Sequence, residues 1–443
     1  RSGGGVWGMR EMKASGIEWI GEIPADWSTE RVKHIFTRKN EKAMQENPTI
    51  LSLARDGVKV RDISNNEGQI AESYYNYNPV EEGDLLLNPM DLYSGANCSI
   101  SKVQGVISPA YINLKANAGV SPAFYDYYFK VQYWLMAFFS YGKGVSYDNR
   151  WTLSVETLMN YPVVALSHEE QCKRADYLDC KCSQIDTIIA RQQEVIEKLK
   201  AYKLSVITEA VTKGLNPDVS MKDSGDSFIG VMPEHWNVAK LGMLFDFLGG
   251  YAYNSDSYTS ESDNQVIRIG NVKSGYMALE NNPVYISDEI ASATDKFRIS
   301  PGSILFTMTG TKGKRDYFFT HLVAEKDCKG KKLFLNQRVG CFIPKESIDA
   351  GYYNYLLKEN RILDAIFVYE TGTANQGNLG IESIRRTKVQ LPSKDEQVKI
   401  REYLDNRCAK IEGLLTRKNE IICRLMAYKK SLIYEVVTGK KEV

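Results

Sequence analysis

Apolar residues recur at alternating steps of four and three along two stretches of the chain, 170–212 and 396–438. This spacing places them in one stripe on a helix, as in the heptad seam of a coiled coil. Neither stretch contains proline, and Gly413 is the one glycine within them. We therefore expect two long helices that pair through these seam residues: Leu178, Ile185, Ile189, Ile196 and Leu199 in the first, and Leu404, Ile411, Leu415, Ile422 and Leu425 in the second.

Both helix starts show the spacing of a capping box, Ser167-x-x-Glu170 and Ser393-x-x-Glu396. In a capping box the serine and glutamate side chains satisfy backbone N–H groups that would otherwise lack partners. Gly214 and the polar residues after it are typical of a helix end. These signals predict helices at 167–214 and 393–439 and a linker at 215–223.

A long helix with a narrow apolar stripe needs a partner. The simplest partner for each helix is the other one, packed antiparallel, with the globular parts of the chain at opposite ends of the pair. We expect the polar seam residues to fix the register of this pairing at some cost in stability; they are Gln192, Lys203, Lys418 and Lys429. The alternative is that each helix packs on its own globular region.

The chain also repeats itself, which bears on its whole architecture. Residues 15–36 align without a gap to 224–245 at an offset of 209, and 170–212 align to 396–438 at an offset of 226, with 20 of 43 positions identical. The stretches between the matched blocks have diverged, and the second is 17 residues longer. Random drift should not preserve the ends and erase the middles. We infer that the matched blocks perform one task twice, whereas the middles perform different tasks.

Both middles contain short apolar runs separated by turn residues, such as 85–87 and 304–306, and each holds a helix candidate near its end, at 123–139 and 351–366. This pattern predicts mixed α/β (α+β) units dominated by short strands. The predicted fold is two globular domains separated by two long antiparallel helices that form a coiled-coil spacer, with an internal pseudo-twofold repeat. The predicted domains are 13–166 and 224–392, preceded by an expression remnant or N-terminal tail at 1–12.

Composition narrows the class of protein without naming a partner. The 443 residues are 43% hydrophobic and 25% charged, with a net charge of +1, so a nucleic-acid surface would have to be a local patch. No apolar run approaches the roughly 20 residues of a membrane span, and we expect a cytoplasmic protein without membrane contacts. The eight cysteines include no C-x-x-C pair and there are four histidines, so no metal site is expected.

Three loops combine glycine with basic and amide residues, at 141–150, 309–315 and 371–378. Glycine lets a backbone approach phosphate, and Arg, Lys, Asn and Gln side chains can read base edges. The candidate DNA-binding residues are Lys143, Tyr147, Asn149 and Arg150 in the first middle, and Lys312, Lys314, Arg315, Asn375, Gln376 and Asn378 in the second. The alternative that these loops are solvated turns stays open, as it does for a lysine strip at Lys329, Lys331 and Lys332.

No catalytic motif was found. The sequence Asn88-Pro-Met-Asp91 lacks the second proline and the aromatic residue of the adenine methyltransferase motif. In 308–315, Met308 stands where a phosphate-binding loop requires glycine, and Arg315 stands where it requires Ser or Thr. We therefore expect a non-catalytic chain with no cofactor of its own.

Three sets of residues carry a family resemblance: SGIEWIGEIPADW with its echo SFIGVMPEHW, the Glu-Gln pairs at the helix starts, and the AYK-x-S-x-I-x-E-x-V-T pattern at the helix ends. Together they resemble the specificity subunit of Type I restriction–modification systems, over nearly the whole chain from about Lys13. The resemblance implies that the two globular domains are target-recognition domains, each reading one half of a split DNA site, and that the two conserved helices hold them apart.

The resemblance also implies the partners. Two methyltransferase subunits, which hold S-adenosylmethionine, would dock on the helices, and an ATP- and Mg-dependent restriction subunit can join. The matched blocks imply two identical partners independently of the resemblance. Two other classes stay open: a coiled-coil adaptor whose globular domains bind proteins, and an enzyme with an unfamiliar active site. A system that only methylates is also compatible with this sequence.

Overall fold

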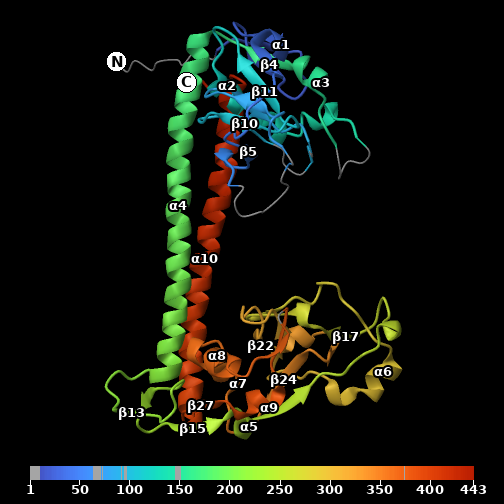
Figure 1. The fold of residues 1–443 in the computed structure, drawn as a ribbon. Helices are drawn as coiled ribbons and strands as arrows, with labels where there is room; N and C mark the ends of the chain where they lie inside the picture. Colours follow the sequence, from blue (N-terminus) through green and yellow to red (C-terminus); the bar gives the residue numbers. More distant parts are fainter. Residues whose placement is uncertain are drawn as a thin grey trace. The chain divides into compact units, whose positions relative to one another are not determined.

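The computed structural model describes residues 10–62, 71, 73–90, 92–93, 97–144, 151–373 and 375–443. The chain divides into two compact units, one made of Arg1–Gln193 with Asn419–Val443 and the other of Glu194–Lys418. Each unit consists of a globular region and one part of each long helix, α4 (His168–Lys213) and α10 (Lys394–Val437) (Figure 1). Within the described ranges, no helix combines the length and the apolar character that crossing a bilayer requires.

A four-stranded antiparallel sheet lies at the centre of the first unit. Its strand order is β4 (Phe36–Lys39), β11 (Ile112–Ala116), β8 (Leu85–Leu87) and β9 (Cys98–Ile100). Helix α2 (Pro122–Trp134) shares the apolar core of this sheet through Phe124 and Phe129. The other elements are β1 (Met12–Ala14), β2 (Glu22–Pro24), β3 (Ser28–Arg31), α1 (Val32–Ile35), β5 (Leu51–Ala54), β6 (Gly57–Val60), β7 (Asn78–Val80), β10 (Gly105–Ile107), η1 (Phe139–Tyr141), α3 (Val155–Met159) and β12 (Pro162–Ala165).

The second unit is built around a sheet of the same design. Its strand order is β16 (Phe245–Gly249), β24 (Val339–Pro344), β20 (Ile304–Thr307) and β22 (Thr320–Leu322). The helices are α5 (Leu241–Leu244), η2 (Ser255–Ser257), η3 (Ile269–Asn271), α6 (Asp288–Ala293), η4 (Asp295–Phe297), η5 (Glu325–Cys328), α7 (Ala350–Leu356), α8 (Asn360–Phe367) and α9 (Ile381–Arg386). The other strands are β13 (Met221–Asp223), β14 (Val231–Pro233), β15 (Asn237–Lys240), β17 (Asn264–Ile267), β18 (Val272–Lys273), β19 (Tyr276–Met277), β21 (Thr309–Gly310), β23 (Lys332–Leu335), β25 (Thr371–Thr373), β26 (Gln376–Asn378) and β27 (Lys388–Leu391).

The two units therefore share one topology, which confirms the mixed α and β class. The predicted runs 85–87 and 304–306 are the sheet strands β8 and β20. The predicted single helix at 351–366 was wrong, because it is divided into α7 and α8. Glu359 causes the break: its carboxylate accepts hydrogen bonds from the N–H groups of Arg361 and Ile362 and starts a new helix.

Burial along the two long helices follows the predicted seam. All ten predicted seam residues are buried or half-buried. Ile196 is 2% exposed, whereas its neighbour Val195 is 37% exposed. In the first unit, Arg174 donates to the carbonyl of Val436 at 2.8 Å, and Asp186 pairs with Lys429 at 2.7 Å. Residue numbers thus rise along α4 as they fall along α10, so the helices run antiparallel there. That the helices act as a spacer between the globular regions stays a prediction.

The second unit contains the repeat counterpart of the Asp186–Lys429 pair. Lys203 forms an ion pair with Glu412, and these residues lie 226 positions from Lys429 and Asp186. Both lysines belong to the polar seam residues that were predicted to set the register. Each contacts the opposite helix, as that prediction requires.

The matched helix starts attach each long helix to its globular region. Trp27 donates through Nε1 to Glu170 at 3.0 Å, and Trp236 donates to Glu396 at 3.1 Å. The serine half of each predicted capping box is present, because Ser167 accepts from the Glu170 N–H at 3.2 Å. The same bond recurs at Ser393, at 3.3 Å. The glutamate half was predicted wrongly, since each carboxylate instead binds a tryptophan far away in the sequence.

The glutamine that follows each glutamate also has a structural role. Gln171 accepts from the N–H of Ser121 at 2.7 Å, where α2 begins, and Gln397 accepts from the N–H of Asp349 at 2.8 Å, where α7 begins. Both glutamines are buried. The Glu-Gln motif therefore binds the leading tryptophan and the helix of the divergent middle in the same way in each unit.

Candidate nucleic-acid interface

In the second unit, one edge of the four-stranded sheet collects the polar loops. Strands β16 and β20 end at this edge and β24 and β22 begin there, as the register pairs Gly249↔Gly340, Thr307↔Val339 and Phe306↔Thr320 show. Because neighbouring strands are antiparallel, the segments that join them emerge together. Two of the predicted DNA-binding loops, 309–315 and 371–378, lie in this group.

The structure joins these two loops into one small sheet. Strand β26 pairs with both β21 and β25, and Thr309 lies opposite Asn378. The Lys312 ammonium donates to the carbonyl of Gly372 at 2.9 Å. Glu370 accepts from the N–H of Gly313 at 3.0 Å. Basic and amide residues that lie about 60 positions apart in the sequence thus share one surface.

Two glycines make this close arrangement possible. Gly372 has a φ of 117°, and a Cβ there would lie 2.0 Å from the carbonyl oxygen of Gln376. A Cβ at Gly377 would lie 2.4 Å from the Glu370 carboxylate and 2.8 Å from the Tyr317 hydroxyl. A side chain at either position would collide with these atoms. The glycines that marked this loop in the sequence therefore allow its backbone segments to pack closely together.

The three predicted cations of this surface differ in how many partners their side chains already have within the protein. Arg315 forms an ion pair with Asp364, and its guanidinium lies 5.7 Å from the centre of the Phe367 ring. Lys312 is held by the Gly372 carbonyl. Lys314 is exposed, and its side chain forms no hydrogen bond or ion pair with any residue in the described ranges. Lys314 is therefore the most available of the three predicted cations.

The predicted amides lie beside these cations. Asn375 and Gln376 are exposed at the tip of the β25–β26 hairpin, and Asn378 is half-buried in β26. Burial, together with Glu370, raises the pKa of Tyr317, whose hydroxyl donates to that carboxylate at 2.7 Å. Tyr317 therefore stays neutral and fixes Glu370 under the hairpin.

In the first unit, Lys143 is the one predicted DNA-binding residue that lies within the described ranges, near the corresponding edge of the sheet. The segment after β8 contacts the residue that follows Thr152, because Leu153 donates its N–H to the carbonyl of Pro89 at 2.8 Å. Lys143 is exposed and forms two backbone hydrogen bonds with Thr152, at 2.8 and 2.9 Å. Three predicted residues, Tyr147, Asn149 and Arg150, lie outside the described residues.

Sequence reasoning missed the turn at 336–338, which joins β23 to β24 at the same edge of the second unit. Gln337 and Arg338 are both exposed there. In the sequence, Asn-Gln-Arg stands between two apolar strands and lacks the glycine that marks the three predicted loops, so local pattern indicates a turn but no binding role.

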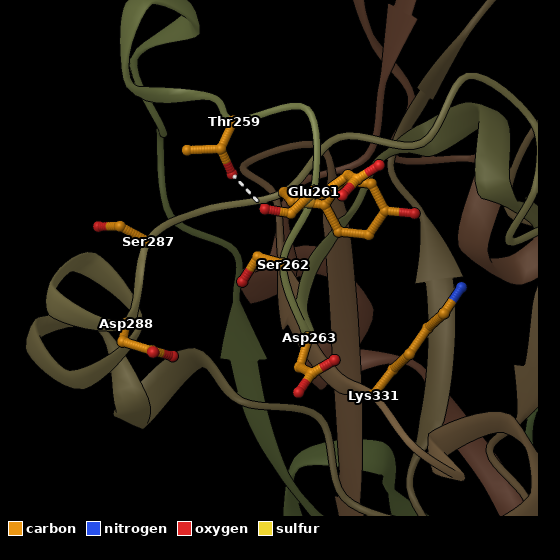
Figure 2. Close-up of a pocket in the computed structure, with 8 residues that line it drawn as sticks. Thr259, Glu261, Ser262, Asp263, Ser287, Asp288 and Lys331 are labelled. Carbon is orange, nitrogen blue, oxygen red and sulfur yellow. Dashed lines mark hydrogen bonds between the residues drawn. The ribbon is translucent and has the colours of Figure 1, made fainter.

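The lysine strip lies in a different environment. Lys331 lines an open pocket of about 680 Å³ with Glu261, Asp263 and Asp288, and it forms an ion pair with Glu280 at 3.3 Å (Figure 2). Figure 2 also shows Thr259 at the rim, bonded to the carbonyl of Glu261. The ion pair with Glu280 and the carboxylates of the pocket lining make this surface less favourable for phosphate. For Lys331 this environment favours the alternative of a solvated surface loop, and the phosphate-contact strip stays a prediction.

The described residues contain no group of three or more His, Cys, Asp or Glu side chains that could hold a metal ion. The candidate site consists of the polar loops at one sheet edge in the second unit and of Lys143 near the equivalent edge in the first unit. Its exposed cations and amides suit contacts with phosphates and base edges.

Comparisons with known proteins agree with this picture. Residues 233–422 match the model of the Type I restriction modification DNA specificity domain. The Type I restriction enzyme MjaVIII specificity subunit of Methanocaldococcus jannaschii is 24% identical over 95% of this chain and 94% of its own length. The EcoBI specificity subunit of Escherichia coli is 20% identical, over 87% of this chain and 78% of its own.

Two solved structures share the fold. A chain from a structure of the type I R-M system aligns with a TM-score of 0.69 and 13% identity, over 95% of this chain and 99% of its own. The HsdS subunit from Thermoanaerobacter tengcongensis aligns with a TM-score of 0.52 and 12% identity, over 95% and 98%. Residues 233–422 thus match a type I restriction–modification DNA specificity domain, and nearly the whole chain is similar to type I restriction enzyme specificity subunits, which are non-catalytic DNA-recognition subunits.

Proposed function

We propose that each unit reads one half of a split, asymmetric DNA site and that the two helices bind two copies of one adenine-N6 methyltransferase subunit. In this proposal S-adenosylmethionine binds to the methyltransferase subunits, and ATP and Mg bind to restriction subunits that join through them. This chain supplies sequence recognition and docking surfaces, and no chemical step.

The observation that carries the two-half-site proposal is the equivalent placement of unlike loops. Both units have the same sheet order, and in each of them described polar residues lie near the end of the third strand of that order, β8 or β20. These residues differ, with Lys143 and Thr152 in one unit and 309–316, 371–373 and 375–378 in the other. The same frame carrying different side chains is what reading two different half-sites requires.

A second apolar stripe supports two identical partners. On α4 it consists of Ile188, Val195 and Tyr202, which are spaced by seven residues and are 43%, 37% and 47% exposed. On α10 the residues 226 positions later are Leu414, Ile421 and Tyr428, which are 44%, 40% and 57% exposed. Each stripe residue immediately precedes a seam residue, so the stripe runs beside the seam and faces outward.

In the second unit, the stripe residues of α4 (Val195 and Tyr202) and of α10 (Leu414) lie on one side of the helix pair. Arg407 of α10 donates to the hydroxyl of Tyr202 on α4 at 3.1 Å, and Arg407 lies seven residues before Leu414. Exposed apolar residues at heptad spacing fit an apolar stripe on a partner helix. Because the same stripe occurs in both repeats, it fits two copies of one partner.

The first experiment is methylation-sensitive sequencing of DNA from a methylation-free host that expresses this chain with its neighbouring methyltransferase gene. The proposal predicts a split, asymmetric motif with modified adenine on both strands, absent when this chain is omitted. A soluble complex without any new modified motif would refute the DNA-reading role.

Native mass spectrometry tests the docking stripes separately. We expect Y202E/L414E and I188E/Y428E each to leave one methyltransferase subunit bound, and the four substitutions together to leave none. Lys200→Glu changes an exposed residue of α4 on the opposite side of the seam from the stripe and should keep two subunits bound. Two bound subunits in the fourfold variant would refute docking at the stripes.

A further inference from the structure

The turn at 336–338 is held rigidly by its backbone. Asn336 donates to the carbonyl of Ile267 at 3.1 Å, which attaches the turn to the end of β17. Gln337 donates to the carbonyl of Tyr251 at 3.0 Å, just beyond the end of β16. The backbone of this turn is therefore fixed by two neighbouring strands before any ligand binds.

A third attachment joins the turn to the small sheet of predicted DNA-binding loops. The carbonyl of Arg338 accepts from the N–H of Met308 at 3.1 Å, and the carbonyl of Met308 accepts from the N–H of Leu379 at 2.9 Å. On the other side, Gly250 allows close approach, since a Cβ there would lie 1.9 Å from the Asn336 carbonyl oxygen. The turn thus occupies a fixed place next to the hairpin that carries Gln376.

The side chains of the turn are free while its backbone is not. Gln337 and Arg338 are exposed, and neither side chain has a hydrogen bond or ion pair among the residues that the structure describes. Arg315, the arginine that the loop pattern had singled out, is instead engaged by Asp364. Arg338 is therefore the arginine at this sheet edge that is ready to bind a ligand.

A cavity of about 460 Å³ adjoins the turn and has a basic, amide-rich lining. Both Gln337 and Arg338 line it, together with Arg268, and no carboxylate is among the lining residues. Arg268 donates to the carbonyl of Asn282, and its Nε is buried without a partner. Two guanidinium groups without a neutralising carboxylate favour an electronegative ligand such as the edge of a guanine.

The chemistry of these side chains separates base reading from phosphate binding. A planar guanidinium can bind O6 and N7 of guanine together, and a glutamine amide can bind N6 and N7 of adenine. Lysine, by contrast, is a flexible point charge suited to phosphate. An exposed arginine on a turn with a fixed backbone is positioned to recognise one base. Lys314 on the adjacent loop is better suited to contact a DNA phosphate.

We infer that the turn 336–338 determines base specificity in the half-site read by the second unit, with Arg338 recognising a guanine and Gln337 a neighbouring base. The inference rests on the proposed function, because it presupposes that this unit reads DNA. It adds residues that lie outside the predicted loops.

The test compares variants in the complex with the methyltransferase, using duplexes in which each base pair of the wild-type motif is replaced in turn. We expect Arg338→Ala to lose discrimination of about 5- to 150-fold at one G·C pair. Arg338→Lys keeps the charge but lacks the planar fork, so it should also lose discrimination while retaining more of the affinity. Lys314→Ala should weaken binding to all duplexes alike and lower the salt slope by about 1.

Arg386→Ala is the matched control, because Arg386 is an exposed arginine on α9 outside the turn and its cavity. It should leave both discrimination and affinity unchanged. The inference is overturned if Arg338→Ala weakens every duplex by one factor, leaves discrimination intact, or alters positions in both half-sites. Failure of the wild-type complex to select any motif would instead overturn the proposed function.

Discussion

Replacing Glu170 by Gln tests how the first helix start is fastened. The Glu170 carboxylate accepts from Arg10 at 2.8 Å, from Arg174 at 2.7 Å and from Trp27 at 3.0 Å. Burial opposes its ionisation, but these hydrogen bonds outweigh burial and lower the pKa of Glu170 to about 2. Glu170→Gln keeps the shape and removes the charge. Arg174, whose side chain is 2% exposed, then loses its counter-ion.

The expected loss follows from that buried charge. Breaking a buried ion pair by removing one partner costs roughly 3–5 kcal/mol. Arg174 keeps two carbonyl partners, Val436 at 2.8 Å and Lys441 at 3.0 Å, so we expect the lower end, about 3 kcal/mol. This loss of stability should be confined to the first unit, because Glu170 and its three side-chain partners, Arg10, Arg174 and Trp27, all belong to it.

The repeat supplies a matched control in Glu396→Gln. Ile400 stands where the first repeat has Arg174, so no buried arginine depends on Glu396. Burial is again opposed by hydrogen bonds, from His235 and Trp236, and the pKa of Glu396 is lowered. The His235 side chain is 51% exposed and can be solvated by water. We expect a loss of about 1 kcal/mol, in the second unit.

Amide hydrogen exchange followed by mass spectrometry measures these losses separately, because it reports opening segment by segment. Peptides from β3 and β12 should exchange roughly 150-fold faster in Glu170→Gln, and those from β15 and β27 roughly 5-fold faster in Glu396→Gln. Equal losses in the two variants, or none in Glu170→Gln, would refute the idea that Arg174 is trapped without its counter-ion.

The dependence on pH gives a second check. Since the folded pKa of Glu170 is about 2 and its ordinary value is 4.5, its contribution is complete above about pH 4.5 and is lost as pH falls towards 2. The difference between wild type and Glu170→Gln should therefore be constant near neutral pH and shrink only below about pH 4.5. A difference that changed between about pH 6 and 8 would point to another group.

Three further predictions concern stability and DNA binding. Ile196→Ala should lower the free energy of unfolding by about 2–4 kcal/mol because Ile196 is 2% exposed. Val195→Ala, at a position that is 37% exposed, should lower it by less than about 0.5 kcal/mol, and urea denaturation followed by circular dichroism compares the two variants. Gly377→Ala should displace the β25–β26 hairpin and weaken DNA binding at one half-site, which DNA competition measures. Gly413→Ala, with nothing within 4 Å of its Cβ, should instead stabilise α10 by about 1 kcal/mol, which thermal melting measures. Burial, aided by the charge of a neighbouring lysine, lowers the pKa of Lys358 to about 8, below its ordinary 10.5. The charged lysine therefore destabilises the folded state fully below about pH 8, and this destabilisation disappears as pH rises to 10.5. Lys358→Met should stabilise the second unit by up to about 3 kcal/mol at pH 7, and urea melts at a series of pH values should show this gain vanish by pH 10.5.

The sequence by itself determined the features that depend on local periodicity. Heptad spacing identified the two long helices and their seam, because the 3.6-residue turn of a helix sets which residues share a face. The repeat identified the duplicated frame, and the Gly, Lys and Asn composition found the loops 309–315 and 371–378.

Tertiary structure alone decided which distant segments meet. No local pattern indicated that those two loops would form one sheet, because strand pairing depends on the rest of the fold and leaves little trace in either strand. The same holds for Glu170, whose spacing predicted a bond to Ser167 but whose carboxylate binds Trp27, 143 positions away. Arg338 was missed for this reason: an Asn-Gln-Arg run becomes a recognition candidate only when hydrogen bonds to Ile267, Tyr251 and Met308 fix its backbone and its side chains stay exposed.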